Sequence, residues 1–214
     1  MNQPLELSIA VLLSGGGTTL QNLIDIRAAG DLPVRIVQVI SSKENVAGIA
    51  RARNAGLPIE VVTRKSSSGV EHFSKRIFDR CRSAGAQLVC LAGFLQLLRI
   101  PEDFTHRVLN IHPSLLPAFG GKGMYGHHVH EAVLAFGAKV SGCTVHFADN
   151  EFDHGPIVSQ RAVPVQDDDT PDTLAARVFE QECLAYPEAI RHFAAKRLLV
   201  EGIRVRVGHG DFSV

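Results

Sequence analysis

The stretch that sets the fold begins at Ile9 and reads IAVLLSGGGTTLQNLIDIRAA as far as residue 29. Its first five residues are apolar and predict a buried strand, and the glycines at positions 15–17 predict a tight turn. From residue 18 onward apolar side chains recur at helical spacing, on a stripe formed by Leu20, Leu23, Ile24 and Ala28. A strand that turns through glycines into a helix opens a β-α-β unit, so the stretch predicts a parallel sheet.

The rest of the chain repeats this alternation. Further runs typical of strands occupy residues 34–40, 59–62, 88–91, 108–111, 140–147 and 157–165. Helix-like stretches occupy residues 45–55, 70–83, 130–136 and 171–195, and Thr170 and Pro171 are typical of the start of the last one. The pattern predicts an α/β fold in a single domain, with a mostly parallel twisted sheet and helices on both faces.

Composition and charge restrict the class of protein. The chain has 214 residues, 45% of them hydrophobic, and equal numbers of basic and acidic side chains, 22 of each. Such a chain can bury one sizeable core, and without a basic excess we expect no nucleic-acid partner. The sequence has no long apolar run and no signal-like segment, so we expect no membrane association and a cytoplasmic location. The four cysteines form no CxxC pair, which favours buried, reduced thiols.

The segment SGGGTTL, residues 14–20, joins the first predicted strand to the first predicted helix. Glycine N–H groups, a helix N-terminus and the hydroxyls of Thr18 and Thr19 are donors suited to a phosphate anion. The segment lacks the last glycine of GxGxxG and the Gly-Lys pair of a Walker loop. An ordinary tight turn explains the glycines equally well, although ligands often collect where parallel strands end.

A second run, Asn110-Ile111-His112-Pro113, ends a predicted strand, and an acid, Asp153, follows on a glycine-containing turn. Residues i and i+2 of a strand face the same side, so the Asn110 amide and the His112 imidazole should project together. Pro113 favours an extended His112. Acyl transfer to an amine needs a donor for the developing oxyanion and a group that exchanges protons, and Asp153 can orient or charge the imidazole.

Each of these residues also has a structural explanation when it is taken alone. A histidine before a proline at a strand end is more often structural than catalytic, and Asp153 can cap its own turn. No Ser or Cys stands in a GxSxG-like setting, which favours direct transfer over a covalent intermediate.

Several segments together resemble the folate-dependent phosphoribosylglycinamide formyltransferases of purine synthesis. They are LSGGG at residues 13–17, LAGFLQLL at 91–98, NIHPSLLP at 110–117, DHGP at 153–156 and, more weakly, QE at 181–182. The resemblance runs from about residue 9 to residue 192. It implies a Rossmann-like formyltransferase fold and direct transfer of a formyl group, through a tetrahedral intermediate, from 10-formyltetrahydrofolate to the amine of glycinamide ribonucleotide.

The resemblance also implies roles for individual residues. Asn110, His112 and Asp153 match the catalytic trio. The residues that match the phosphate and ribonucleotide site are Gly15, Gly16, Gly17, Thr18, Thr19, His130 and Glu182. The residues that match the folate site are Leu95, Gln96, Leu97, Leu98, Asn110, Val145 and Asp149. The family motif further suggests a cis peptide bond before Pro117.

The resemblance divides the predicted domain, residues 1–214, into functional halves. Residues 1–100, approximately, would bind the ribonucleotide, residues 101–195 would bind folate and carry the catalytic groups, and the tail 201–214 is left unassigned. Two departures from the family pattern stand out: Thr18-Thr19 replaces Ser-Asn in the phosphate loop, and Gln96 replaces an arginine near the folate site. We expect small-molecule substrates only, and a monomer or homodimer.

His127, His128 and His130 follow a glycine-rich segment and are spaced like metal ligands. The glycines suggest a mobile loop rather than a rigid ligand set, so we expect no metal.

Other functions compete with the transferase. A folate hydrolase, which gives the formyl group to water, usually carries an N-terminal regulatory domain, and a first strand near Ser8 leaves no room for one. A formyltransferase for charged transfer RNA would need a further C-terminal domain and a basic face, whereas transfer to another amine acceptor stays open. A nucleotide-binding regulatory module would explain the glycine loop, but not Asn110, His112 and Asp153 together.

Overall fold

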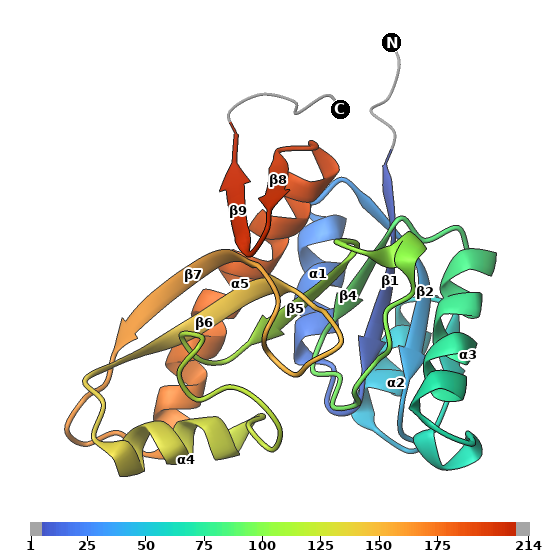
Figure 1. The fold of residues 1–214 in the computed structure, drawn as a ribbon. Coiled ribbons are helices and arrows are strands. Elements are labelled where there is room, and N and C mark those ends of the chain that lie inside the picture. Colours follow the sequence, from blue (N-terminus) through green and yellow to red (C-terminus); the bar gives the residue numbers. More distant parts are fainter. Residues whose placement is uncertain (1–5, 209–214) are drawn as a thin grey trace. The chain divides into compact units, whose positions relative to one another are not determined.

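A computed structural model describes residues 6–208 of the chain (Figure 1). The chain forms two compact units, Met1–Leu109 and Asn110–Val214, called here the first and the second unit. Both units combine α-helices and β-strands, which confirms the predicted α/β class. In the part of the chain that the structure describes, no helix has the length and apolarity needed to cross a membrane.

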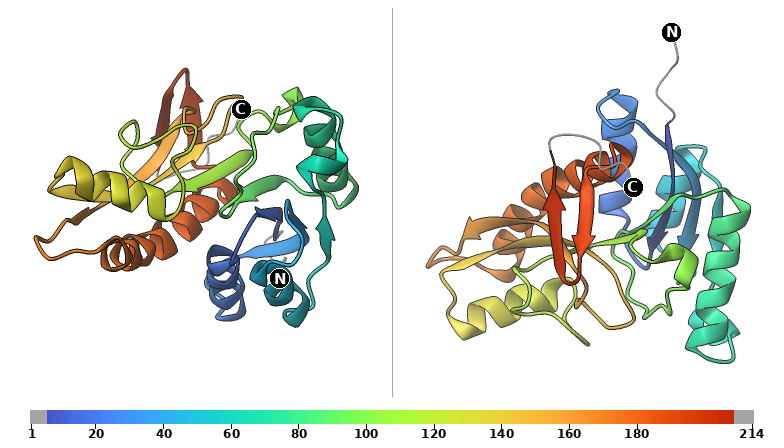
Figure 2. Two further views of the ribbon diagram at one scale, coloured as in Figure 1. Left: turned by 90° about the horizontal axis from the view of Figure 1, so that it is seen from below. Right: turned by 45° about the horizontal axis from the view of Figure 1, so that its top comes forward.

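The first unit is a layered structure with a parallel sheet. Its strands lie in the order β3-β2-β1-β4, and all the pairs are parallel. Helices α1 and α2 lie on one face of these strands and α3 lies on the other (Figures 1 and 2). The elements are β1 (Leu7–Leu13), α1 (Thr18–Ala28), β2 (Val34–Ser41), α2 (Ala47–Asn54), β3 (Ile59–Val61), η1 (Arg64–Ser66), α3 (Val70–Ser83), β4 (Leu88–Leu91) and η2 (Glu102–Phe104).

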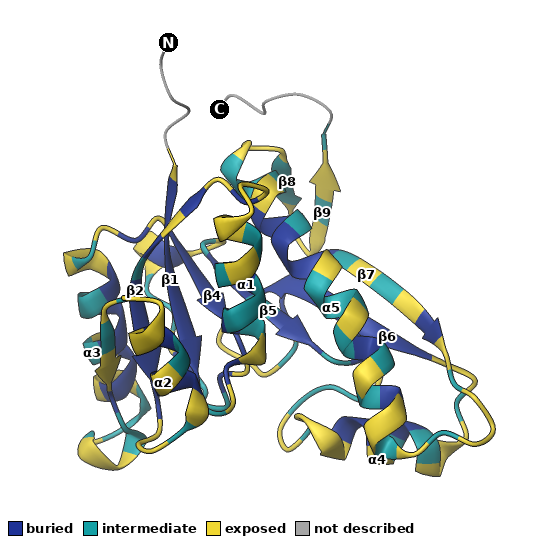
Figure 3. Ribbon diagram, turned by 180° about the vertical axis from the view of Figure 1, so that it is seen from behind, coloured by how far each residue is buried: buried dark blue, intermediate teal, exposed yellow. Residues whose placement is uncertain are grey.

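Strand β1 is the centre of this layer, and all of its residues are buried (Figure 3). A strand covered by helices on both faces must be apolar throughout, which explains the unbroken run that follows Ile9. Helix α3 shows the opposite pattern, an apolar stripe of Phe73, Ile77, Phe78 and Cys81 with charged residues elsewhere. The stripe faces the sheet, so period and burial agree with the sequence prediction.

The second unit contains strands in the order β5-β6-β7-β9-β8. Strands β6 and β7 are antiparallel, β7 and β9 are parallel, and β8 and β9 form an antiparallel hairpin. Helix α5 packs against β6 and β7, and α4 packs against α5 (Figure 3). The elements are β5 (Val108–His112), which begins just before the unit boundary, α4 (His127–Phe136), β6 (Val140–Phe147), β7 (Ile157–Pro164), α5 (Pro171–Ala194), β8 (Leu198–Glu201) and β9 (Arg204–Val207).

Helix α5 begins where the sequence predicts. The Thr170 hydroxyl accepts a hydrogen bond from the Thr173 N–H at 3.2 Å, and the Thr173 hydroxyl accepts one from the Thr170 N–H at 2.9 Å. This reciprocal capping box satisfies N–H groups that the first helical turn leaves without partners. Pro171 follows as the first helical residue, where the missing N–H carries no cost.

One prediction about the elements is wrong, and one segment that the sequence left uncertain proves to be structured. Helix α4 begins at His127 rather than at residue 130, and its first turn forms side-chain pairs that the glycine-rich sequence hides: His127 with Asp172 at 3.4 Å, and His128 with Glu131 at 3.3 Å. The tail also contains structure, because β8 and β9 form a hairpin around Gly202, which has a left-handed φ of 61°. Residues 209–214 of the predicted tail lie outside the described residues.

Candidate active site

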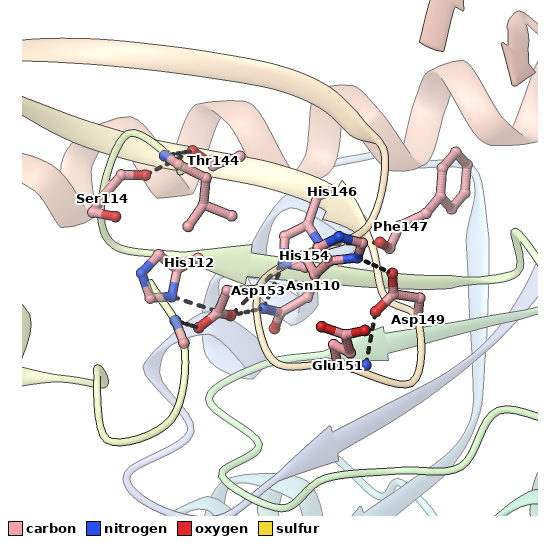
Figure 4. Close-up of polar contacts among 12 residues, drawn as sticks. Asn110, His112, Ser114, Thr144, His146, Phe147, Asp149, Glu151, Asp153 and His154 are labelled. Carbon is pink, nitrogen blue, oxygen red and sulfur yellow. Dashed lines mark hydrogen bonds and ion pairs between the residues drawn. The ribbon is translucent and has the colours of Figure 1, made fainter. Parts of the chain in front are cut away.

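Strand β5 ends with the two polar residues that the sequence singled out. Asn110 Nδ2 lies 3.4 Å from Asp153 Oδ1, and His112 Nδ1 also lies 3.4 Å from that oxygen (Figure 4). Both side chains therefore project to the same side of β5, as the strand spacing predicts. All three groups belong to the second unit, so one compact unit brings the amide, the imidazole and the carboxylate together.

The turn that carries Asp153 is held in an unusual conformation. Asp153 has a left-handed φ of 53°, which asparagine and aspartate tolerate better than most residues. Phe147 N–H donates to the Pro156 carbonyl at 2.8 Å and closes the loop that contains the turn. A side chain at Gly155 would collide with the Phe147 carbonyl, so only glycine fits there.

Within this loop, Asp149 is committed to local contacts. Its Oδ1 accepts from the Glu151 N–H at 2.8 Å, and its Oδ2 lies 2.7 Å from His154 Nδ1 (Figure 4). The hydrogen bond from His154 to Asp149, with the charges of Asp149 and Glu151, raises the pKa of the His154 imidazole. These contacts tie together the two ends of the segment that presents Asp153.

The Asp153 carboxylate is almost covered, with 10% of its side chain exposed. Burial alone would raise the pKa of this carboxyl. The hydrogen bond and charge of His112 and the Gly121 N–H at 2.9 Å outweigh burial, and the pKa of Asp153 is lowered. Asp153 is therefore an anion at neutral pH, in a site where water screens its charge poorly.

Both ring nitrogens of His112 face oxygen atoms. Nε2 lies 2.9 Å from the Phe119 carbonyl oxygen, and Nδ1 faces Asp153. A carbonyl and a carboxylate only accept hydrogen bonds, so the two contacts are satisfied together when each ring nitrogen carries a proton. The imidazole of His112 is therefore fixed between two hydrogen-bond acceptors, one on each side of the ring.

His146, the residue before the last one of strand β6, was not among the predicted catalytic residues, yet it fixes the Asn110 amide. His146 Nδ1 lies 3.0 Å from the Phe147 carbonyl, so this nitrogen carries the proton, and Nε2 accepts from Asn110 Nδ2 at 3.0 Å. Burial lowers the pKa of His146, although the Phe147 carbonyl and Asp153 act in the opposite direction, and the ring stays neutral at pH 7. One Asn110 N–H is thus held by His146, and the other makes only the long contact to Asp153.

The short segment 116–121, which follows strand β5, contacts both His112 and Asp153 through its backbone. The Phe119 carbonyl contacts His112, and the Gly121 N–H contacts Asp153. The bond between Leu116 and Pro117 is cis, which confirms the conformation that the family motif suggested. Leu116 N–H donates to the Thr144 hydroxyl at 3.0 Å, so the segment is anchored to β6.

Gly120 lies between these two backbone contacts and has no room for a side chain. An added Cβ would approach Leu116 Cδ2 at 2.5 Å and Asp153 Cβ at 3.3 Å. We expect Gly120→Ala to displace this segment, to destabilise the fold by about 1–3 kcal/mol and to lower kcat roughly tenfold. Urea unfolding and steady-state rates would measure both effects, with the exposed neighbour Lys122→Ala as the control. Unchanged kcat in Gly120→Ala would show that the backbone contacts do not position the pair.

Helices α4 and α5 contribute His130 and Glu182 to the second unit. His130 is buried, with 4% exposure, and its Nδ1 has no partner among the described residues. Burial and the neighbouring His127 and His112 lower the pKa of His130 to about 4. Burial raises the pKa of Glu182 to about 7, and the charge of His112 opposes that rise. His130 is therefore a neutral imidazole and Glu182 a readily protonated carboxyl, and both interact electrostatically with His112.

The raised pKa of Glu182 predicts a pH effect on stability. Between pH 4.5 and about 7 the unfolded chain ionises this group before the folded protein does, so its contribution to the free energy of unfolding falls as the pH rises. The loss amounts to at most about 3 kcal/mol. His130 acts in the opposite direction between pH 4 and 6.5, because its pKa is lowered.

A comparison of variants separates the two groups. We expect Glu182→Gln to remove the loss, so that the variant gains stability relative to wild type as the pH rises through this window. Urea unfolding at several pH values would measure the difference, with the exposed Glu180→Gln in the same helix as the control. Parallel pH curves for wild type and Glu182→Gln would contradict the raised pKa.

The first unit contains the glycine loop and the segment with Leu95, Gln96, Leu97 and Leu98. Gly17 has a left-handed φ of 73° and precedes α1, and no side chain caps the helix, so its first N–H groups remain available. Thr18 is exposed and Thr19 half-buried. The Leu95 N–H donates to the Ser14 hydroxyl at 2.9 Å, so the two predicted segments lie side by side within this unit.

The remaining predicted folate residues differ in exposure. Leu98 is buried, and Leu95, Gln96 and Leu97 are half-buried. Val145 is fully buried in β6, so its side chain belongs to the core and only its backbone can meet a ligand. No group of three histidine, cysteine, aspartate or glutamate residues suited to a metal ion occurs within residues 6–208.

The fold and the buried group of Asn110, His112 and Asp153 are suited to acyl transfer, and comparison with known sequences identifies the family. A sequence model described as "Formyl transferase" matches residues 7–190, and the chain belongs to this family. It is 38% identical over 202 residues to the chloroplastic phosphoribosylglycinamide formyltransferase of Arabidopsis thaliana, covering 92% of this chain and 68% of that protein. A Vigna unguiculata relative is 37% identical over 193 residues, and the match spans 62% of its length.

A bacterial relative matches over most of both chains. The phosphoribosylglycinamide formyltransferase of Haemophilus influenzae is 39% identical over 192 residues, which is 89% of this chain and 88% of that protein. Among solved structures, glycinamide ribonucleotide transformylase 1 from Symbiobacterium toebii has a TM-score of 0.90 and 42% identity, covering 96% of this chain and 95% of that one. The formyltransferase fold that the sequence resemblance implied is thereby confirmed.

Proposed function

We propose that this protein transfers a formyl group from 10-formyltetrahydrofolate to the amine of glycinamide ribonucleotide, a step of purine biosynthesis. The observation that carries the proposal is the buried contact of His112 with Asp153, beside the Asn110 amide. The names of the relatives described above support the choice of acceptor.

The reaction begins when the amine nitrogen attacks the formyl carbon. The new carbon–nitrogen bond forms as the carbonyl π-electrons move to oxygen, and the resulting tetrahedral intermediate carries an oxyanion. The Asn110 Nδ2–H that makes only a long contact to Asp153 can turn to this oxygen, and His112, when it carries a proton on each ring nitrogen, stabilises the oxyanion further. Both groups are fixed before substrate binds, so little reorganisation is needed in the transition state.

Proton transfer completes the reaction. The attacking nitrogen becomes positive and must lose a proton, and the folate nitrogen must gain one before its bond to carbon breaks. Asp153 is an anion with a lowered pKa beside His112 and Asn110, so it can accept this proton directly or through a water molecule and then pass it to the folate nitrogen. The products are the formylated ribonucleotide and tetrahydrofolate, and no oxidation or covalent enzyme intermediate is required.

The proposal assigns substrate-binding residues to each unit separately. In the proposal, residues 15–19 bind the ribonucleotide phosphate through backbone N–H groups and the N-terminus of α1. His130 and Glu182 bind the glycinamide end, where an unpartnered imidazole nitrogen and a carboxyl suit an amide and an amine. Residues 95–98 and Val145 with Asp149 contact folate, and we expect no metal to take part.

We further propose that the protein is cytoplasmic, acts on small-molecule substrates, and is a monomer or a homodimer. Three of the four cysteines, Cys81, Cys90 and Cys143, are buried, and burial raises the pKa of the Cys81 and Cys143 thiols to about 12. Such thiols are unreactive, which fits a reducing compartment. Sedimentation at several concentrations would distinguish monomer from dimer.

One measurement tests the proposed reaction: loss of 10-formyltetrahydrofolate with and without glycinamide ribonucleotide, together with detection of the formylated product. We expect consumption only when the ribonucleotide is present. Equal consumption without it would indicate a hydrolase, and no consumption in either mixture would contradict the assignment. The Asp153→Asn protein, prepared in the same way, controls for contaminating activity.

A further inference from the structure

Arg51, in helix α2, forms hydrogen bonds with the glycine loop of the first unit and with the helix that follows the loop. Its Nε donates to the Gly16 carbonyl at 3.0 Å, and its Nη1 donates to Gln21 Oε1 at 3.2 Å. Gln21 lies in the first turns of α1 and donates in turn to Asp25. The half-buried guanidinium of Arg51 thus joins the loop to the helix that follows it.

Helix α2 also packs so closely against the loop that positions 17 and 48 have no space for a side chain. Gly48 N–H donates to the Gly15 carbonyl at 3.1 Å. A Cβ on Gly17 would lie 2.6 Å from Gly48 Cα, and a Cβ on Gly48 would lie 2.9 Å from the Gly15 carbonyl. Glycine at positions 17 and 48 is therefore required for this contact, and α2 serves as a rigid support for the loop.

These contacts decide where the loop N–H groups point. In a trans peptide the C=O and the N–H of the same plane point in opposite directions. When Gly48 and Arg51 hold the Gly15 and Gly16 carbonyls on the α2 side, the N–H groups of Gly16 and Gly17 are directed to the opposite side. Successive N–H groups that point the same way form a concave donor set for an anion.

We propose that Arg51 is a positioning residue for phosphate recognition. It keeps the Gly16–Gly17 peptide in the orientation that presents its N–H to the phosphate, and its charge adds positive potential to a loop that contains no lysine or arginine of its own. The proposal rests on the proposed function, which assigns the ribonucleotide phosphate to this loop. Arg51 belongs neither to the glycine motif nor to the segments that carry the family resemblance.

The test compares Arg51→Ala with Arg53→Ala, because Arg53 is an exposed arginine on the same helix. We expect Arg51→Ala to raise the KM for glycinamide ribonucleotide roughly tenfold, which is the loss of one charge-assisted contact. The dissociation constant for inorganic phosphate, measured by calorimetry, should rise by the same factor. The kcat at saturation and the KM for 10-formyltetrahydrofolate should stay within about twofold of wild type, and Arg53→Ala should match wild type.

Arg51→Lys separates the effect of the two hydrogen bonds from the effect of the charge. Lysine retains the charge, but it lacks the planar guanidinium that contacts the Gly16 carbonyl and Gln21 at the same time. We expect it to recover only part of the phosphate affinity. Full recovery in Arg51→Lys, or unchanged phosphate affinity in Arg51→Ala, would overturn the positioning role. If Arg51→Ala does not fold, Arg51→Lys must still bind phosphate more weakly than wild type. Calorimetry with phosphate needs no turnover, so an inactive wild type would contradict the proposed function while the role of Arg51 is still tested.

Discussion

Replacing Asp153 with asparagine should lower kcat by roughly 10³–10⁴-fold, the size of effect seen when a buried acid beside a catalytic histidine is neutralised. The carboxylate contacts His112, Asn110 and the Gly121 N–H, so its charge supports every part of the candidate catalytic group. An amide in its place cannot accept a proton from the attacking amine. It also removes the negative charge that lies 3.4 Å from His112 Nδ1.

Folding of the variant should be nearly normal, because asparagine has the same size and tolerates the left-handed φ of 53° at this position. Stopped-flow or steady-state rates would measure the loss of kcat, and the melting temperature would establish that the fold is retained. Glu151→Gln neutralises an exposed acid in the same loop and should keep wild-type turnover. Near-normal kcat in Asp153→Asn would remove Asp153 from the mechanism.

Replacing Asn110 with alanine should cost roughly 3 kcal/mol of transition-state stabilisation, or about a hundredfold in kcat, if its amide holds the oxyanion. The KM values should change little, because the interaction forms only when charge develops on oxygen. The structure adds a second consequence. His146 Nε2 loses the hydrogen bond from Asn110, so a modest loss of stability, on the order of 1 kcal/mol, should accompany the kinetic effect.

Steady-state kinetics with both substrates would separate the possible roles of Asn110. A raised KM with intact kcat would make Asn110 a binding residue rather than an oxyanion donor. Urea unfolding of the same variant measures the cost of the lost contact to His146. No change in either quantity would show that the amide neither binds nor positions anything in the site.

Local sequence was sufficient for most of the fold. Helix α3 and strands β4 and β6 have the predicted bounds, and the other predicted elements agree within a few residues. These elements form because periodicity, caps and glycine turns act over short distances, as in the box formed by Thr170 and Thr173. Local geometry also correctly predicted that Asn110 and His112 face the same side, because strand spacing alone decides it.

Other features depend on contacts between residues far apart in the chain. His146, Phe119 and Gly121 surround the predicted trio, but they do so through contacts to Asn110, His112 and Asp153 that no local pattern reveals. A histidine at the end of an apolar strand was the only local signal for His146. The start of α4 at His127 likewise reflects a partner, Asp172, that comes from a later helix.

The sequence by itself determined which side chains can perform the chemistry and on which kind of element each one lies. Only the tertiary structure decided which acceptor faces each histidine ring nitrogen. It also decided which way each loop peptide points, for example at Gly16, whose carbonyl accepts from Arg51. The physical reason is that secondary structure follows from interactions a few residues apart. The orientation of a buried polar group is instead set by whichever donor or acceptor the folded chain brings against it.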